Sequence, residues 1–262
     1  MGIPINGSIR TCSPSDPPVS LGMLDTNKLD PKDPAGTEAA AQTAWMRIDP
    51  STGKNVGGWG YGVAISPLDG TVWQSNGESG GPLNKLYMFD PKSRKFKDYP
   101  LTPPGRVPHG IDASTDGKIW FSAGSGHLGR FDPKTEQYSY WELPGPKLKG
   151  TGKETGTTVF PYFLWVDQFD VLGLGKGTVI VCGTTSDSLM IFDPRKETFS
   201  VIQVPYPLPF YTRGLDGRID DPKAGWKGRG LWATYSSYMP RFTESKMGSV
   251  SHIQLRPNPL AY

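Results

Sequence analysis

The sequence is poor in cysteine, in long apolar runs and in net charge. Cys12 and Cys182 are the only cysteines among 262 residues. One pair cannot define a disulfide framework, and Cys182 lies in the apolar run TVIVCG, where a cysteine behaves as a small buried hydrophobic residue. No apolar run approaches the roughly 20 residues of a membrane-spanning helix, so no membrane span is predicted. A net charge of +3 with both signs interleaved argues against nucleic acid as a partner.

Several catalytic motifs are also missing. The chain contains no Gly-x-Ser-x-Gly elbow, no Gly-rich phosphate loop, no His-Glu-x-x-His pair and no Cys/His spacing typical of zinc. The common signatures of serine hydrolases, nucleotide hydrolases and zinc proteases are therefore excluded. Met1–Arg10 has neither the basic start nor the apolar run of a signal peptide, so none is expected in this chain.

What the chain does contain is a repeat. Four segments share one motif, an apolar run followed by Asp-Pro and a polar turn: WMRIDPSTGK at Trp45–Lys54, LYMFDPKSRKF at Leu86–Phe96, LGRFDPKTEQY at Leu128–Tyr138 and LMIFDPRKETF at Leu189–Phe199. Successive Asp-Pro pairs are 41, 42 and 61 residues apart. The first two spacings match one propeller blade, and the third indicates a blade with an insertion of about twenty residues.

Each repeat predicts two β-hairpins. At the Asp-Pro turn the aspartate can accept a hydrogen bond from the backbone two residues on, and proline cannot extend a sheet ladder, so the chain must reverse. A second hairpin stands upstream, because Asp-Gly separates two strand-like runs in Gly62–Gly77 and in Gly110–Gly124. Two hairpins make a four-stranded sheet, and several such sheets arranged radially make an all-β fold, the β-propeller.

The repeats also set the expected domain organisation. Residues 1–43 predict an extended N-terminal arm, and residues 44–262 predict the propeller. The first repeat supplies only its second hairpin and the last is also partial, so the two ends are complementary. We expect about five four-stranded blades; four blades, or a fragment of a larger propeller, are the alternatives. Two insertions, Gly145–Phe160 and Pro205–Gly230, interrupt the rhythm, and function tends to reside in such loops.

One blade carries a more specific pattern. The segment Gly105–Pro144 contains Pro-His-Gly-Ile, then Asp-Gly-Lys-Ile-Trp-Phe, then Leu-Gly-Arg, and ends in Leu-Pro. It resembles a blade of the virginiamycin B lyase (streptogramin lyase) family of β-propellers. Three further stretches resemble the C-terminal portion of bacterial lyase-like propeller proteins: Phe163–Gly175, Val204–Thr234 and Ile253–Ala261. The resemblance implies an extracellular or periplasmic protein.

The resemblance also implies a chemistry. In that family a histidine acts as base in an elimination across the ester of a cyclic peptide, assisted by a divalent metal held near the Glu of a Trp-Phe-Thr-Glu strand. The resemblance implies that His109 corresponds to this catalytic base. Ala123 stands where the family has that Glu, so the electrostatic partner that usually dominates such catalysis is absent from this blade.

Other residues are candidates for contacting a ligand at the central channel. Tyr61, Tyr162 and Tyr211 begin corresponding segments and are expected to rim the channel, unless they are core residues. Asp167 and Gln168 follow an inner strand and are expected either to face the channel with His109 or, for the aspartate, to cap a turn. Arg213 completes the predicted set of substrate-binding residues: Tyr61, Tyr162, Asp167, Gln168, Tyr211 and Arg213.

An acidic cluster in the second insertion offers hard oxygen ligands. Asp216, Asp220 and Asp221 lie close together around Gly217, as sites for calcium or magnesium require. The competing interpretation is internal salt bridging to neighbouring cations: Arg218, Lys223 and Lys227. A divalent metal, Mg²⁺ or Ca²⁺, is therefore the expected cofactor only if the cluster binds metal.

Two classes of function remain open from sequence. The first is a lyase-like propeller that acts on a small ester or lactone at the channel, with His109 as base. The second is a non-catalytic propeller that binds a ligand or presents the Pro205–Gly230 loop to a protein. A lactone hydrolase is a further alternative, although it needs a Glu at an inner-strand start, which this sequence lacks. In every case the expected partner is a small molecule or a protein.

Overall fold

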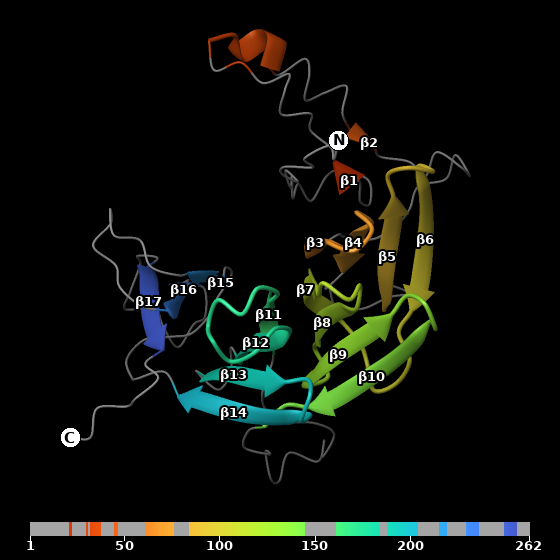
Figure 1. The fold of residues 1–262 in the computed structure, drawn as a ribbon. Coiled ribbons are helices and arrows are strands. Elements are labelled where there is room, and N and C mark those ends of the chain that lie inside the picture. The colour runs from red at the N-terminus through yellow and green to blue at the C-terminus, as the bar shows by residue number, and fades with distance from the viewer. Residues whose placement is uncertain are drawn as a thin grey trace, which may run out of the picture.

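The computed structural model describes residues 61–75, 84–144, 161–183 and 188–203, with shorter pieces at 21–22, 30, 32–37, 45–46, 215–218, 229–235 and 249–255. The regular secondary structure of this part of the chain is β-strand, apart from one helical turn at 34–37 (Figure 1). Within these residues no helix has the length and apolarity needed to cross a membrane.

Three antiparallel sheets of four strands follow one another along the chain, and we call them blades 1, 2 and 3. Blade 1 contains β3 (Val63–Ile65), β4 (Val72–Ser75), β5 (Lys85–Asp90) and β6 (Lys95–Pro100). Blade 2 contains β7 (Pro108–Ala113), β8 (Ile119–Ala123), β9 (His127–Asp132) and β10 (Gln137–Glu142). Blade 3 contains β11 (Pro161–Asp167), β12 (Thr178–Gly183), β13 (Ser188–Asp193) and β14 (Thr198–Gln203).

A fourth sheet has three strands among the described residues, and we call it blade 4. It contains β15 (Leu215–Arg218), β16 (Arg229–Tyr235) and β17 (Ser249–Leu255). A separate pair joins β1 (Leu21–Gly22) to β2 (Trp45–Met46), so a short piece of the predicted arm lies beside the first repeat.

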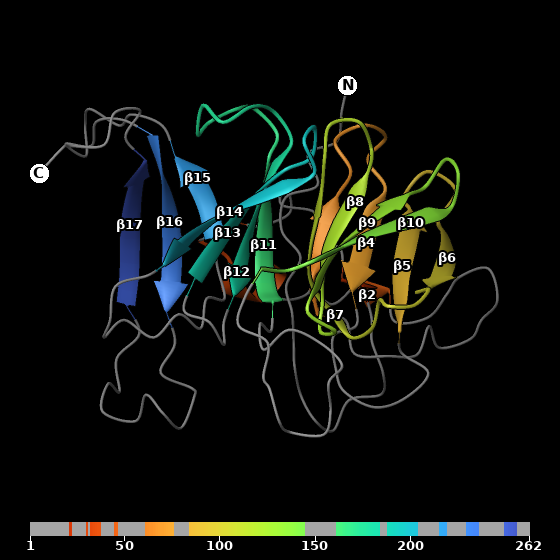
Figure 2. The same ribbon diagram turned by 90° about the horizontal axis from the view of Figure 1, so that it is seen from below.

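The sheets are arranged as the blades of a β-propeller. The first strand of each sheet is innermost: β3 contacts β7, β7 contacts β11, and β11 contacts β15. Viewed along the inner strands, the four sheets fan out around a common centre (Figure 1), and from below the inner strands stand side by side (Figure 2). The prediction of an all-β propeller is confirmed. The total of about five blades and the domain boundary at residues 43 and 44 stay predictions.

The Asp-Pro turns close the outer hairpin of each complete blade, as predicted. In each turn Oδ1 of the aspartate accepts a hydrogen bond from the backbone amide two residues on, at 2.9 Å from Lys92, 2.9 Å from Lys134 and 3.0 Å from Arg195. The residue before the returning strand then takes a positive φ in all three turns: 58° at Arg94, 56° at Glu136 and 54° at Glu197. The repeated Asp-Pro motif thus forms the same turn in each of these blades.

The inner hairpins of blades 1 and 2 turn at Asp-Gly. Gly70 and Gly117 have φ values of 78° and 81°, a region that glycine enters without the steric cost of a side chain. Oδ1 of Asp69 accepts from the amide of Thr71 at 3.0 Å. In blade 3 the corresponding connection is the longer loop of residues 168–177.

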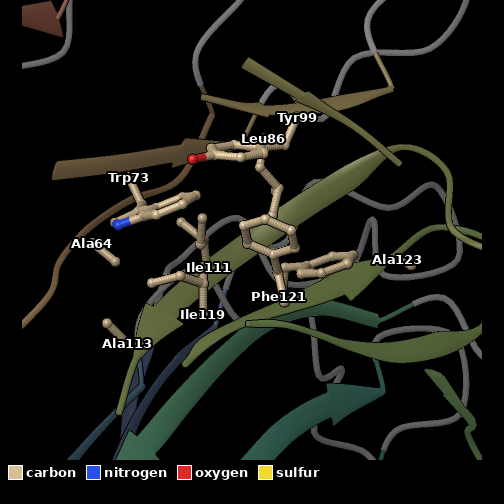
Figure 3. Packing of buried hydrophobic residues seen from close by; sticks show 10 residues of the cluster. Ala64, Trp73, Leu86, Tyr99, Ile111, Ala113, Ile119, Phe121 and Ala123 are labelled. Carbon is tan, nitrogen blue, oxygen red and sulfur yellow. The ribbon is translucent and has the colours of Figure 1, made fainter. Parts of the chain in front are cut away.

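The apolar cores lie between blades, because inner strands are buried on both faces. Alternate residues of β8 point to opposite sides: Ile119 and Phe121 pack with blade 1, whereas Trp120 packs with blade 3. Figure 3 shows the first of these cores, where Ile119 and Phe121 of blade 2 lie in one cluster with Trp73 and Tyr99 of blade 1. Blade 2 is therefore held by both of its neighbours.

The same alternation continues along β12. Val179 and Val181 pack toward blade 2, and Ile180 and Cys182 pack toward blade 4, where they join Leu231 of β16. Cys182 is fully buried in this strand, as predicted for a small hydrophobic residue, and Cys12 lies outside the described residues.

Candidate functional site

Three ring-bearing side chains occupy the same position at the start of the inner strands in blades 1, 2 and 3. The equivalence follows from the cross-strand pairs Val63/Gln74, Ile111/Phe121 and Leu164/Val181. Two residues before the first member of each pair, the sequence places a ring: Tyr61, His109 and Tyr162. We call these three residues the ring triad.

The ring triad converges in space. The imidazole centroid of His109 lies 4.8 Å from the ring of Tyr61 and 5.2 Å from the ring of Tyr162, and the two tyrosine rings are 5.4 Å apart. Tyr61 meets both partners edge-on, at interplanar angles of 73° and 88°, the arrangement that aromatic quadrupoles favour. Sequence reasoning selected all three residues as channel candidates, and the structure brings them into mutual contact.

The imidazole of His109 is buried and oriented. Its Nδ1 lies 3.1 Å from the carbonyl oxygen of Val107, and since a carbonyl can only accept, Nδ1 carries the proton and Nε2 is the basic nitrogen. Only 8% of the residue is exposed, and this burial lowers the pKa of His109 below its usual value, against a smaller opposing effect of the Val107 hydrogen bond. At neutral pH the site thus contains an uncharged imidazole.

The backbone before His109 is strained. Val107 has a φ of 50°, a left-handed conformation that costs a β-branched residue about 1–3 kcal/mol. Neighbouring groups hold it: its amide donates to Oδ1 of Asn84 at 2.9 Å, and its carbonyl accepts from the amide of Gly124 at 3.1 Å as well as from His109. Sequence reasoning missed Val107 and Asn84, because a valine before a proline predicts an extended backbone.

Asp167 and Gln168 lie at the other end of the inner strands. The carboxylate of Asp167 is fully buried and accepts from the amides of Val171 and Leu172 at 2.7 and 2.8 Å, so it caps the 168–177 loop. Nε2 of Gln168 donates to the carbonyl of Ala113 at 2.6 Å. Ala113 is four residues beyond His109 on β7, about 13 Å along the strand. The structure therefore does not bring these two residues to the ring triad.

The remaining candidates belong to blade 4 and its insertion. Asp216 lies on β15 opposite Trp232 of β16. The matching pair Leu215/Ala233 identifies Arg213, two residues earlier, as the sequence counterpart of His109. The other predicted residues of this region lie outside the described part of the chain together with Arg213: Tyr211, Asp220 and Asp221.

The surroundings of His109 do not provide a set of metal ligands. Ala123 lies directly opposite Pro108 on one side and His127 on the other, so this position holds a methyl group and not a carboxylate. Across the described residues no group of three or more His, Cys, Asp or Glu side chains could hold an ion. The described residues next to His109 therefore do not fit a metal, and we derive no step through one.

Comparisons with known proteins show the fold only. No protein-family model matches the chain, and no curated protein matches it. The chain is similar to Kuenenia stuttgartiensis hydrazine synthase at 16% identity and a TM-score of 0.50, over 74% of this chain and 46% of that one. Virginiamycin B lyase from Staphylococcus aureus has 17% identity and a TM-score of 0.47, over 75% of this chain and 55% of that one. A streptogramin B lyase structure has 12% identity and a TM-score of 0.47, over 82% and 59%.

The chain thus spans about half the length of the solved chains that it matches. At these identities the likeness extends to the fold alone, and function has to be argued from the ring triad.

Proposed function

We propose that this propeller binds a small, uncharged organic molecule at the ring triad. The observation that supports the proposal is the convergence of Tyr61, His109 and Tyr162 from three successive blades on one point at the start of their inner strands. Ligand sites in proteins combine aromatic faces with a few fixed polar groups. Here the polar group is the neutral imidazole of His109, and burial disfavours a charged ligand beside it.

The chemistry of the triad favours an ester or a lactone. The tyrosine rings offer apolar surface and phenolic donors, and the imidazole offers one oriented nitrogen. Arg213, the sequence counterpart of His109 in blade 4, is proposed as the donor to a ligand carbonyl oxygen.

Ligand-observed NMR with a panel of small lactones and cyclic esters tests the proposal. Members of the panel should bind the wild type, and His109→Phe should abolish their binding. His127→Phe is the matched control, because His127 makes the same contact from Nδ1 to the carbonyl two residues earlier, at 3.1 Å from Ser125, but lies outside the triad. Equal binding to all three proteins, or to none, would overturn the proposal.

A second candidate is an elimination of the streptogramin lyase type, and the oriented neutral base favours it. Nε2 of His109 would remove a proton from the carbon next to the one that bears the ester oxygen. A carbon–carbon double bond would form, the carbon–oxygen bond would break, and the carboxylate would leave. Because Ala123 provides no carboxylate to hold a metal ion beside His109, we expect the reaction to be slow.

The missing carboxylate gives a direct test of this second candidate. Incubation with virginiamycin B, followed by mass spectrometry, should detect ring-opened product from wild type and more from Ala123→Glu with added Mg²⁺. His109→Gln should remove the activity of both proteins. Absence of product from wild type and from Ala123→Glu would leave binding as the function.

A further inference from the structure

We infer that Ser75 and Ser122 are positioning residues for the ring triad, joined in one hydrogen-bond relay that passes around the propeller from blade 1 to blade 3. Each serine comes from the second strand of its blade and links a peptide group of its own inner strand to a peptide group of the next. The inference concerns how the triad is held, and only its consequence for ligands rests on the proposed function.

The relay is continuous. The amide of Gly62 donates to Oγ of Ser75 at 2.8 Å, and that hydroxyl donates to the carbonyl of His109. The carbonyl of His109 and the amide of Gly110 are two ends of one peptide group, and Gly110 donates to Oγ of Ser122 at 2.8 Å. The hydroxyl of Ser122 donates in turn to the carbonyl of Tyr162 at 3.1 Å.

The peptide groups in the relay are those of the ring triad. The amide of Gly62 shares its peptide group with the carbonyl of Tyr61, so the relay joins the backbones of Tyr61, His109 and Tyr162. Chains of hydrogen bonds polarise one another in a medium of low dielectric. Ser75 and Ser122 are both fully buried, so water does not replace a lost partner.

Two glycines make this approach between blades feasible. A Cβ on Gly62 would lie 2.7 Å from the carbonyl oxygen of His109, and a Cβ on Gly110 would lie 2.9 Å from the carbonyl oxygen of Tyr162. Inner strands with side chains at these positions could not come within reach of one serine hydroxyl. In blades 1 and 2 the Gly and the Ser therefore act as a pair.

The positions equivalent to these serines in blades 3 and 4 also hold side chains that can form hydrogen bonds. Each serine follows the residue whose pairing defines the register: Gln74 in blade 1 and Phe121 in blade 2. The same count gives Cys182 in blade 3 and Thr234 in blade 4. All four side chains can both donate and accept a hydrogen bond, which is what a relay requires and what strand packing alone does not.

The test compares Ser75→Ala with Ser75→Thr in the full chain. We expect Ser75→Ala to release the His109 peptide group, to expose the imidazole and to raise the pKa of His109 toward its usual value, as followed by NMR titration of the imidazole Cε1–H signal. Ser75→Thr keeps the hydroxyl and should restore the wild-type titration. Ser66→Ala is the control, because Ser66 is also buried but its hydroxyl has no hydrogen-bond partner in the described chain. An unchanged titration in folded Ser75→Ala would overturn the inference.

A double-mutant cycle tests the relay itself. If the two serines act through the shared peptide group, the melting temperature of the Ser75→Ala/Ser122→Ala protein should fall by less than the sum of the two single losses. Additive losses would mean two independent bonds and would overturn the relay. Neither measurement needs a ligand, so its failure is distinguishable from failure of the proposed function. If a lactone binds, each single alanine variant should weaken its binding by about tenfold.

Discussion

The burial of His109 couples the protonation of one imidazole to the stability of three blades. Its pKa in the folded protein is lowered by burial, whereas in the unfolded chain it takes the usual value near 6.5. Between these two values the unfolded state binds more protons, so the free energy of unfolding rises with pH across that window and is constant above it. The other titratable groups of the ring triad are Tyr61 and Tyr162, and a phenol ordinarily ionises only at alkaline pH.

This linkage gives a prediction at the scale of the residue. As pH falls below about 6.5, the wild type should lose stability relative to His109→Gln, which has no proton to bind. Urea unfolding of both proteins from pH 7.5 to pH 5 measures the difference, in which the titration of all other groups cancels. A difference independent of pH would show that the imidazole is solvated in the folded protein.

Gly110 provides a second prediction at this scale. A Cβ there would meet the backbone of blade 3 at 2.9 Å, from the amide nitrogen of Leu164 and from the Cα of Phe163. Backbone cannot move aside as a flexible side chain can, so Gly110→Ala should cost more than about 2 kcal/mol of unfolding free energy. Gly70→Ala is the comparison, since no atom lies within 4 Å of its Cβ and only its positive φ opposes the change, at about 1 kcal/mol. Thermal unfolding of the two variants should rank them in that order.

At the residue scale, the repeat indicated which side chains begin the inner strands. Tyr61, His109 and Tyr162 occupy one register position and lie in contact, whereas their roles in binding and catalysis stay predictions. The orientation of Asp167 could not be predicted in this way, because a buried aspartate finds partners in any nearby backbone amide, here those of Val171 and Leu172. The serine relay went unnoticed, because a single serine in a strand carries no signal until the blades are aligned by register.

At the scale of the element, the Asp-Pro turn combines a backbone cap with a charge. In blade 2, Oδ1 of Asp132 accepts from the amide of Lys134, and Oδ2 pairs with Nζ of Lys118 at 2.7 Å. Asp132→Ala removes both contacts and should cost about 1–2 kcal/mol of unfolding free energy. Asp132→Asn keeps the side-chain acceptor and loses only a partly exposed ion pair, so it should cost less than about 1 kcal/mol. Chemical denaturation of both variants should show this order; equal losses would assign the whole effect to the charge.

The hairpins were the most predictable elements of the chain. Asp-Pro and Asp-Gly act within a few residues, and their effect on the backbone does not depend on distant parts of the fold. Val107 shows the opposite case. Its positive φ is held by hydrogen bonds to Asn84 and Gly124, and both partners are distant from it in sequence. Local sequence rules therefore predicted the turns and missed the strained residue beside the site.

At the scale of the whole molecule, the cores shared between blades predict one cooperative unfolding transition. Phe192 of blade 3 packs against Trp120 and Trp141 of blade 2 at centroid distances of 5.8 and 4.9 Å. Phe192→Ala should cost about 3–5 kcal/mol and lower the melting temperature without splitting the transition. Val201→Ala in the same blade changes a residue that is 49% exposed and should alter stability by about 0.5 kcal/mol or less. Two separate calorimetric transitions in Phe192→Ala would show that the blades fold independently.

The alternation of β8 between two cores also restricts how this chain can change in length. Loss of one residue from the middle of that strand would turn the following side chains to the opposite face. The indole of Trp120 would then point to the core that now holds Phe121, and both cores would lose their packing. In a strand with one solvent-facing side, the same deletion would disrupt only one core. Insertions and deletions should therefore be tolerated only in the connections, as the ten-residue loop 168–177 of blade 3 already illustrates beside the shorter connections 66–71 of blade 1 and 114–118 of blade 2.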